Sequence, residues 1–461
     1  MRGAKKKPKM TGDPSRTTTQ RNYSRLDRQT SLSASNEPKA FSPALANRLA
    51  GDSAYRDRPF SFQWQSPTVL VEALGLPAAP NAAYGATRRM ILAEALLGIA
   101  SGQGVSYSRR KVFYAHGQQY RPGACTYATV LGAVAELVRE GWLFEHRVEP
   151  NNRGWQSSFW ATPDLVRIAS ALGTEPSFEE RETILLTDCA GDLVDYPMTR
   201  QTDRLHRALQ PINAYLKELQ IDLPGAVRQG RHLRVGGLLM LPIPGNGLRR
   251  IFSEAFTCHG RAYAWWQNIP KTVRSGLMID GKTTDEADYR ALHAAILYEK
   301  RGIKFSGDPY DVDGFDRGLV KLGFNIALNT KTRYGAVVVI ARDAGVSRAD
   351  AAELLAAIEK RHESISGDFF SGVGLRLMRT DSELILGALK AVNNEGIGAL
   401  PIHDALIAPA RSIGLAEEKM VEAFETLVGR VNPCQVRIKG IKVPHMGEGV
   451  GLPPTSLPRA A

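Results

Sequence analysis

The sequence predicts an α+β protein in which a small helical domain with a β-hairpin precedes a larger mixed domain. Three observations lead to this prediction. Residues 61–177 show helical periodicity followed by a hairpin pattern, residues 178–445 combine strand-like segments with amphipathic helices, and no Pro/Gly-rich linker interrupts the second part. With 461 residues, of which 43% are hydrophobic, the chain has room for two or three domains.

The first 60 residues form a basic and polar segment. They contain 13 Lys and Arg against 5 Asp and Glu, so that +8 of the formal charge of +12 lies there. Because few of these residues are apolar, burial cannot offset the entropy of ordering, and we expect residues 1–60 to be a disordered tail. Its role is either a sequence-independent phosphate-binding arm or a solubilising leader. Residues 446–461, rich in proline, predict a second flexible tail.

Composition also narrows the partners and the compartment. A pI near 9.5 indicates a polyanionic partner, most simply nucleic acid. The tail lacks the apolar core of a secretory signal, and the chain has no run of about 18 apolar residues. We therefore expect a cytoplasmic, nucleoid-associated protein without membrane contact. The four cysteines form no CxxC pair, which predicts free thiols and no structural metal; they are Cys125, Cys189, Cys258 and Cys434.

Residues 61–177 predict three helices in sequence. The first, residues 86–100, is followed by Ser-Gly-Gln-Gly, which is typical of a helix end. The second, near residues 107–117, is basic through Arg109, Arg110 and Lys111. The third begins after the N-cap candidate Thr126. It places apolar residues at helical spacing toward a core, namely Val130, Val134, Leu137 and Val138.

A hairpin is predicted after the third helix. Residue types alternate on both sides of residues 150–154, where Pro, Asn and Gly indicate the turn. Helix, basic helix, helix and a ribbon with Arg153 at its tip is the order of a winged helix-turn-helix, and this order resembles bacterial DNA-binding domains. In such domains the third helix enters the major groove, and we expect Arg153 to touch the DNA backbone. Many domains of this kind bind proteins instead, so DNA binding is a hypothesis.

Two isolated aspartates in apolar, strand-like surroundings mark the second domain. They are Asp288 and Asp404, and between them a helical segment carries Arg317 and Lys321, four residues apart on one face. Two carboxylates can hold a pair of Mg²⁺ ions about 3.5–4 Å apart, which activate an attacking 3′-hydroxyl and stabilise a leaving pyrophosphate. Cations on a nearby helix hold the triphosphate in line. Template-directed nucleotidyl transfer requires this combination of groups.

An ordered series of short segments surrounds the two aspartates. It consists of Gly260-Arg261, Gln267-Asn268-Ile269-Pro270, Arg274, Asp288-Tyr289, Arg317, Lys321, Phe324-Asn325 and Pro401-Ile402-His403-Asp404. This series resembles the family A DNA polymerases, typified by bacterial DNA polymerase I, over residues 250–409. The resemblance implies a compact right-hand fold of palm, fingers and reduced thumb. Single-subunit phage and mitochondrial RNA polymerases share this palm and a Gly-Arg-x-Tyr segment, so the choice of nucleotide sugar stays open.

The resemblance also implies roles for single residues. Asp288 and Asp404 would ligate two Mg²⁺ ions, for which Mn²⁺ can substitute, and the main-chain carbonyl of Tyr289 would add an oxygen. Arg317, Lys321 and Asn325 would bind the nucleoside triphosphate. The residues implied to contact the primer-template are Arg261, Tyr263, Gln267, Arg274 and His403. For Arg261 a structural salt bridge is the alternative, and for His403 a purely structural role.

Two positions depart from the family pattern. His293 stands where family A DNA polymerases usually place a Glu that screens out the 2′-hydroxyl, five residues after the first metal-binding Asp. Asn329 stands eight residues after Lys321, where a Tyr normally stacks near the incoming sugar and base. In the family both positions contribute to the selection of the nucleotide sugar, so we expect altered discrimination between deoxyribose and ribose.

The sequence therefore predicts a template-directed nucleotidyltransferase. The leading hypothesis is a compact DNA-directed DNA polymerase of a plasmid or mobile element, with a DNA primer-template and nucleoside triphosphates as partners. A second hypothesis is a single-subunit RNA polymerase or primase. A third, from another class, is a catalytically silent DNA-binding replication initiator.

Overall fold

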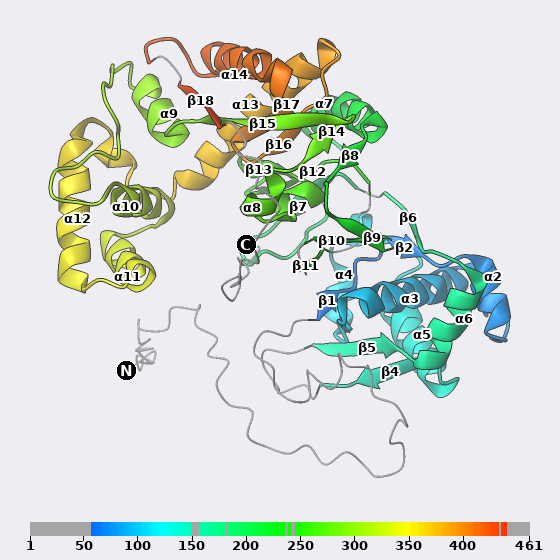
Figure 1. The fold of residues 1–461 in the computed structure, drawn as a ribbon. Coiled ribbons are helices and arrows are strands. Elements are labelled where there is room, and N and C mark those ends of the chain that lie inside the picture. Colours follow the sequence, from blue (N-terminus) through cyan, green and yellow to red (C-terminus); the bar gives the residue numbers. More distant parts are fainter. Residues whose placement is uncertain are drawn as a thin grey trace, which may run out of the picture.

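The structure is a computed structural model, and it describes residues 57–148, 156–180, 182–229, 231–235, 238–240, 245–432 and 435–439. Figure 1 shows an N-terminal domain, a central body of small sheets and helices, and a helical lobe beside that body. The mixture of helices and small sheets confirms the predicted α+β class. Residues 1–56 and 446–461, which make up nearly all of the two predicted tails, lie outside the described residues.

The N-terminal domain begins before the predicted boundary at residue 61. Strand β1 (Arg58–Pro59) pairs with β3 (Val105–Tyr107) in a four-stranded sheet of order β1-β3-β5-β4. The other elements of this domain are α2 (Thr68–Ala73), α3 (Ala82–Ser101), α4 (Lys111–Ala115), η1 (Gln118–Tyr120), α5 (Tyr127–Arg139), β4 (Leu143–His146), β5 (Ser157–Ala161) and α6 (Pro163–Leu172).

Local sequence signals explain the helices of this domain. Helix α3 starts at the N-cap Asn81 and ends at Gly102, which takes the left-handed conformation with φ 64°. Helix α5 begins after Thr126, whose hydroxyl accepts a hydrogen bond from the Thr129 amide. The apolar face predicted for α5 is buried in the core of the domain; it comprises Val130, Val134 and Leu137, with Val138 half-buried beside them. The predicted positions of both helices are thereby confirmed.

The predicted hairpin is also present. Strands β4 and β5 are antiparallel, with Leu143 opposite Ala161 and His146 opposite Ser158. The tip of this hairpin, including Arg153, lies outside the described residues. Beyond the hairpin, β6 (Ser177–Phe178) pairs with β2 (Trp64–Gln65).

Two three-stranded sheets lie between the N-terminal domain and the rest of the central body. One has the order β13-β12-β7, and its strands are β7 (Ile184–Thr187), β12 (Arg249–Ser253) and β13 (Cys258–Tyr263). Helix α7 (Arg200–Glu218) packs beside β7. The other sheet contains β9 (Val227–Gln229), β10 (His232–Val235) and β11 (Leu238–Met240).

The largest sheet has six strands and crosses the centre of the body (Figure 1). Its order is β16-β17-β15-β14-β8, with β18 pairing β15 on the edge that β17 leaves free. The strands are β8 (Ile221–Asp222), β14 (Met278–Ile279), β15 (Lys282–Tyr289), β16 (Leu400–Ile402), β17 (Ala405–Pro409) and β18 (Val436–Lys439). Strand β15 alternates, with Ala287 and Tyr289 buried while Glu286 and Asp288 are half-buried.

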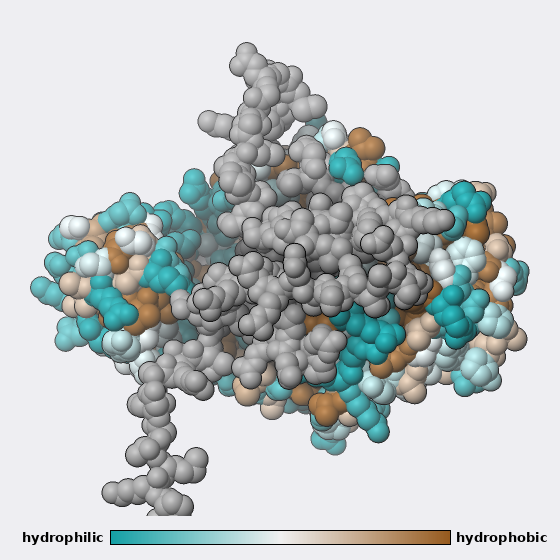
Figure 2. Space-filling model, turned by 90° about the horizontal axis from the view of Figure 1, so that it is seen from below, coloured by the Kyte–Doolittle hydropathy of each residue, from teal (hydrophilic) through white to brown (hydrophobic). Residues whose placement is uncertain are grey.

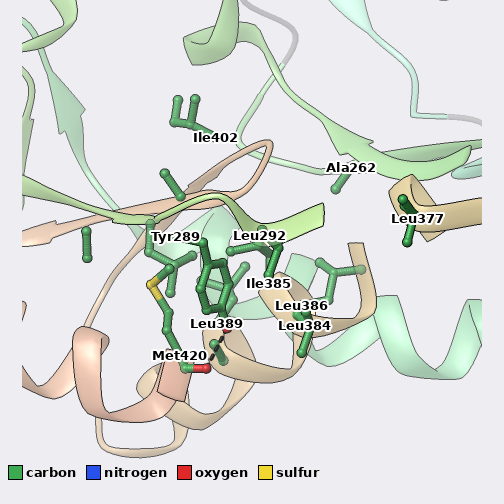
Figure 3. Close-up of a cluster of buried hydrophobic side chains, with 14 of the residues drawn as sticks. Ala262, Tyr289, Leu292, Leu377, Leu384, Ile385, Leu386, Leu389, Ile402 and Met420 are labelled. Carbon is green, nitrogen blue, oxygen red and sulfur yellow. Dashed lines mark hydrogen bonds between the residues drawn. The ribbon is translucent and has the colours of Figure 1, made fainter. Parts of the chain in front are cut away.

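Two long helices cover the buried face of this sheet. They are α13 (Gly374–Asn394) and α14 (Ile413–Leu427). Figure 3 shows the Tyr289 side chain pointing from β15 into this apolar cluster, where its hydroxyl donates a hydrogen bond to the Met420 carbonyl. Successive side chains of a strand point to opposite faces of its sheet. Because Tyr289 points into the core, Asp288 and Glu286 point to the opposite face.

The helical lobe contains three helices connected to the sheet by α9 (Leu292–Lys300). They are α10 (Arg317–Asn329), α11 (Arg333–Ala344) and α12 (Arg348–Arg361), followed by the 3₁₀ turn η3 (Glu363–Asp368). Gly323 permits the close approach of α10 to α12, since a Cβ there would lie 2.8 Å from the Ile358 Cδ1 atom. Figure 2 shows that the surface of this lobe, at the left, mixes hydrophilic residues with small hydrophobic patches.

No helix in the described part of the chain is both long and apolar enough to span a bilayer. Cys125, Cys189 and Cys258 are free thiols, while Cys434 lies outside the described residues.

Candidate active site

The large sheet brings the two isolated aspartates together. Asp288 on β15 lies opposite Ala405 on β17, and Asp404 directly precedes Ala405. The Tyr289 amide donates to the Asp404 carbonyl over 3.3 Å, which continues the ladder to the turn. Burial and the negative charge of Asp288 raise the pKa of Asp404, so the two carboxyl groups lie within electrostatic range of each other.

The turn that carries Asp404 has an uncommon backbone conformation and is held in place by hydrogen bonds from two side chains of another segment. His403 has φ 53°, a left-handed conformation that is uncommon for residues other than glycine. The carbonyl of Pro401, just before the turn, accepts hydrogen bonds from Trp266 Nε1 at 3.1 Å and from Gln267 Nε2 at 3.0 Å. Gln267 Nε2 also donates to the Ala262 carbonyl at 3.0 Å. Gln267, expected from the resemblance to contact nucleic acid, therefore uses its amide nitrogen to hold the Asp404 turn in place.

Strand β18 places a lysine on the open face of β15. Lys439 lies opposite Glu286 in the ladder, and its Nζ atom donates to Glu286 Oε1 at 2.8 Å and also contacts Asp288 Oδ2. Although burial opposes a charged lysine, these two hydrogen bonds raise the pKa of Lys439. Arg274 completes the cluster, with its Nη2 atom 3.6 Å from Glu286 Oε2. The sequence analysis did not single out Glu286 or Lys439.

A third carboxylate, Asp381 on α13, lies beneath the site and is fully buried. Arg261 donates to it from Nε at 3.2 Å and from Nη2 at 2.5 Å, and His293 Nε2 lies 3.2 Å from its Oδ2 atom. Although burial opposes the charge of Arg261, the Asp381 carboxylate raises its pKa. Arg261 thus forms the structural salt bridge that was the alternative to nucleic-acid contact. The charge of Asp381 also contributes to the raised pKa of Asp404, which places the two near each other.

One signal in the sequence could have pointed to Asp381. It falls four residues after Leu377 and three before Leu384, on the apolar face of a helix. An acidic residue at such a position requires a buried cation as a partner.

Gly260 sets the direction of the strand that carries Arg261. Its φ of 83° is unfavourable for other residues, and a Cβ there would lie 2.6 Å from the Phe252 ring. Its carbonyl accepts from Arg250 Nε at 2.8 Å. On the same strand, the Tyr263 ring meets the His403 ring edge to face, with centroids 6.4 Å apart.

Helix α10 presents the predicted pair of cations on one face. The Arg317 guanidinium lies 5.4 Å and the Lys321 Nζ atom 6.0 Å from the centre of the Tyr310 ring, so both stand over the same aromatic residue. Arg317 Nε also donates to Asp308 Oδ2 at 2.6 Å. Burial raises the pKa of Tyr310 to about 12, and the charge of Asp404 contributes to this shift. Tyr310 and the cations over it therefore lie within electrostatic range of the carboxylate pair.

Two residues expected near the nucleotide have other contacts. The Tyr289 side chain points into the core (Figure 3), so only its main chain borders the site. Asn329 Nδ2 donates to the Asn325 carbonyl at 2.8 Å, one turn earlier in α10. The Asn329 side chain also packs so close to Gly374 that a Cβ there would clash with it. Asn329 therefore joins α10 to α13 while it stays exposed, and its role as a nucleotide contact stays a prediction.

The basic residues of the N-terminal domain divide into two groups. Arg109 is bound internally, because its Nη1 atom donates to the Tyr107 hydroxyl at 2.7 Å and to Glu145 Oε1 at 2.8 Å. Arg110 and Lys111, at the start of α4, are exposed. Only the exposed pair is free to meet a polyanion from this position.

The residues at the site fit a hard divalent cation. Among the described residues there is no cluster of three or more His, Cys, Asp or Glu with metal-binding geometry. Mg²⁺ commonly binds through one or two carboxylates, with water and phosphate oxygens completing its shell. The mutual repulsion that raises the pKa of Asp404 is the condition that such a cation relieves.

Comparison with known proteins does not assign the chain to a family. No protein-family model matches the chain, and no curated protein matches it. One solved structure that it resembles is the POL domain of Pol1 from M. smegmatis in complex with DNA primer-template and dNTP, with a TM-score of 0.27 and 13% identity. This match covers 42% of the present chain and 47% of that one, so the chain spans about half of its length. At so low a TM-score the likeness says nothing about function, which has to come from the site.

Proposed function

We propose that this protein is a template-directed nucleotidyltransferase that extends a nucleic-acid strand, and that it is a compact DNA-directed DNA polymerase. The observation that carries the proposal is the meeting of Asp288 and Asp404 at one end of adjacent strands. Two half-buried carboxylates that repel each other are costly unless a cation joins them. A purely structural sheet has no reason to place them there.

Asp288 and Asp404 would hold Mg²⁺. When bound, the metal supplies activation of the 3′-hydroxyl and stabilisation of the pyrophosphate leaving group. The chain itself positions the two carboxylates: Gln267 and Trp266 fix the turn of Asp404, and the ladder to Ala405 fixes Asp288.

Helix α10 would bind the triphosphate. Its cations, Arg317 and Lys321, are held over the Tyr310 ring, which limits their motion before substrate arrives. Asp308 pairs with Arg317 and would exchange that contact for phosphate.

We further propose that the N-terminal domain is a winged helix that binds DNA. Its order of α3, β3, α4, α5 and the β4–β5 hairpin supports this, together with the exposed Arg110 and Lys111. A DNA-binding domain joined to a short polymerase body suits a plasmid or mobile element that encodes few proteins, and we include that setting in the proposal.

The test is nucleotide incorporation by the full-length protein with Mg²⁺ on defined templates. Deoxynucleotides and ribonucleotides are offered separately, each with and without a primer. We expect extension of the primer by deoxynucleotides, and its loss in Asp288→Asn and Asp404→Asn. The control is Asp203→Asn, which changes an exposed aspartate of α7. Full activity of either site variant contradicts the proposal, and DNA binding without incorporation supports the replication-initiator hypothesis.

One observation favours an RNA product as the second candidate. His293, at the position where a Glu would screen the sugar, is drawn to the buried Asp381. The His293 side chain therefore interacts with Asp381, whereas the family pattern has a Glu at this position that screens out the 2′-hydroxyl. Incorporation of ribonucleotides at a rate equal to or above that of deoxynucleotides would establish this candidate.

A further inference from the structure

The C-terminal strand β18 delivers a cation directly to the carboxylate pair. Glu286 and Asp288 stand two residues apart on the same face of β15, and Lys439 is opposite Glu286 in the ladder. The Lys439 ammonium contacts both carboxylates. The side chains of Lys439 and Asp288 are each 27% exposed, so the pair is partly shielded from water but still reachable by a small ion.

We infer that Lys439 is a tethered counter-ion that competes with the divalent metal for Asp288. This inference rests on the proposed function, since it concerns the same metal site. The Oδ2 atom of Asp288 accepts from this ammonium, so the negative charge that would attract a metal ion to Asp288 is already partly neutralised. A metal ion that binds Asp288 therefore gains less from that charge unless the Lys439 ammonium moves away.

The other carboxylate of the pair differs from Asp288. The Arg261 guanidinium, whose charge acts on Asp404, donates to Asp381 through two nitrogens. Asp288, in contrast, is in direct contact with the Lys439 ammonium. The two carboxylates are thus unequally neutralised, and the metal position at Asp288 is the weaker one for as long as Lys439 occupies it.

An ordinary cross-strand ion pair would have a different consequence. Exposed pairs of this kind contribute little to stability, and their removal leaves metal binding elsewhere unchanged. A tethered counter-ion instead opposes the metal, so removing its charge strengthens metal binding. The two roles are therefore separated by whether removal of the Lys439 charge strengthens metal binding or leaves it unchanged.

The first test measures Mn²⁺ binding to the metal-free, full-length protein by electron paramagnetic resonance. Lys439→Met removes the charge at similar length, and Lys439→Arg keeps it. Lys419→Met is the matched control, because Lys419 lies on α14 and pairs with Glu418 and Glu422. We expect Lys439→Met to bind Mn²⁺ about fivefold more tightly than the wild type, after allowance for solvent screening. Lys439→Arg and Lys419→Met should stay near the wild type.

The second test needs no substitution. The rate at which an amine reagent modifies each lysine of the wild-type protein is measured by mass spectrometry, with and without saturating Mn²⁺. We expect Mn²⁺ to increase the modification of Lys439, because displacement exposes its amine, and to leave Lys419 unchanged. This test holds even where Lys439→Met fails to fold.

The outcomes separate this inference from the proposed function. Equal Mn²⁺ binding by the wild type, Asp288→Asn and Asp404→Asn would show that these aspartates do not form a metal site, and the proposed function would then fail. Binding that depends on these aspartates, but is unchanged or weaker in Lys439→Met, would overturn only the role of Lys439. Unchanged labelling of Lys439 on addition of Mn²⁺ would overturn it as well.

Discussion

Replacing Asp404 by Asn should stabilise the metal-free protein while it abolishes nucleotide incorporation. Burial and the charge of Asp288 raise the pKa of Asp404 in the folded state. Above this raised pKa the Asp404 carboxylate is ionised in both the folded and the unfolded protein. The repulsion between Asp404 and Asp288 then destabilises the folded state alone. As the pH falls through the raised pKa, the folded state takes up a proton first and the cost disappears. The asparagine removes the cost at every pH.

Coulomb's law sets the scale of this effect. Two unit charges about 4 Å apart repel by about 1 kcal/mol in water and about 4 kcal/mol at an effective dielectric constant of about 20. Because the site is half open to solvent, and because Lys439 at Asp288 and Arg261 near Asp404 offset part of the repulsion, we expect a gain of about 1 kcal/mol. For a domain of this size that gain raises Tm by about 2–4 °C.

Calorimetry in the presence of a chelator measures this difference. We expect Asp404→Asn to melt above the wild type at about pH 8 and to lose that advantage as the pH falls through the raised pKa of Asp404. Excess Mg²⁺ should reverse the order, since it stabilises only the protein that binds it. Asp203→Asn serves as the control and should show neither effect. A lower Tm for Asp404→Asn at about pH 8, or an advantage independent of pH, would refute this account of the carboxylate pair.

Three further predictions concern the supports of the site. Asp381→Ala leaves the half-buried Arg261 without its partner and should lower the free energy of unfolding by about 3 kcal/mol, as measured in urea; a change below about 1 kcal/mol would contradict the role of this ion pair. Gly260→Ala should cost about 1–3 kcal/mol in the same assay, because its Cβ meets the Phe252 ring at a positive φ, and a neutral effect would be inconsistent with that contact. Lys321→Met should raise KM for the nucleoside triphosphate at least about tenfold without lowering Tm, and an unchanged KM would exclude Lys321 from the phosphate site.

Local patterns in the sequence predicted much of the fold. The cap at Thr126 and the apolar spacing after it are sufficient to place α5, because capping and periodicity act within a few residues. Asp404 could be identified for a similar reason, because it stands in a short turn between two apolar strands. Asp288 lies in a strand that also carries Asp285 and Glu286, so it is identified from its place in the ordered series of segments and not from its strand.

The charged partners of the site could not be predicted in this way. Lys439 matters only because β18 pairs with β15 in a register that sets it opposite Glu286, and no local pattern encodes that register. Arg261 was expected to face the nucleic acid, yet the buried Asp381 holds it. Tertiary packing brings α13 against β13 and thereby gives Arg261 an internal carboxylate as its partner in place of a phosphate.

The place of β15 in the large sheet has a consequence for synthesis on the ribosome. The half of this strand that bears Asp288 pairs with β17 and β18, both of which follow it much later in the chain. The N-terminal domain, with its own sheet and core, precedes both of these strands. A nascent chain can therefore acquire its first folded unit early, while the pair of Asp288 and Asp404 is assembled only after β17 and β18 have been made.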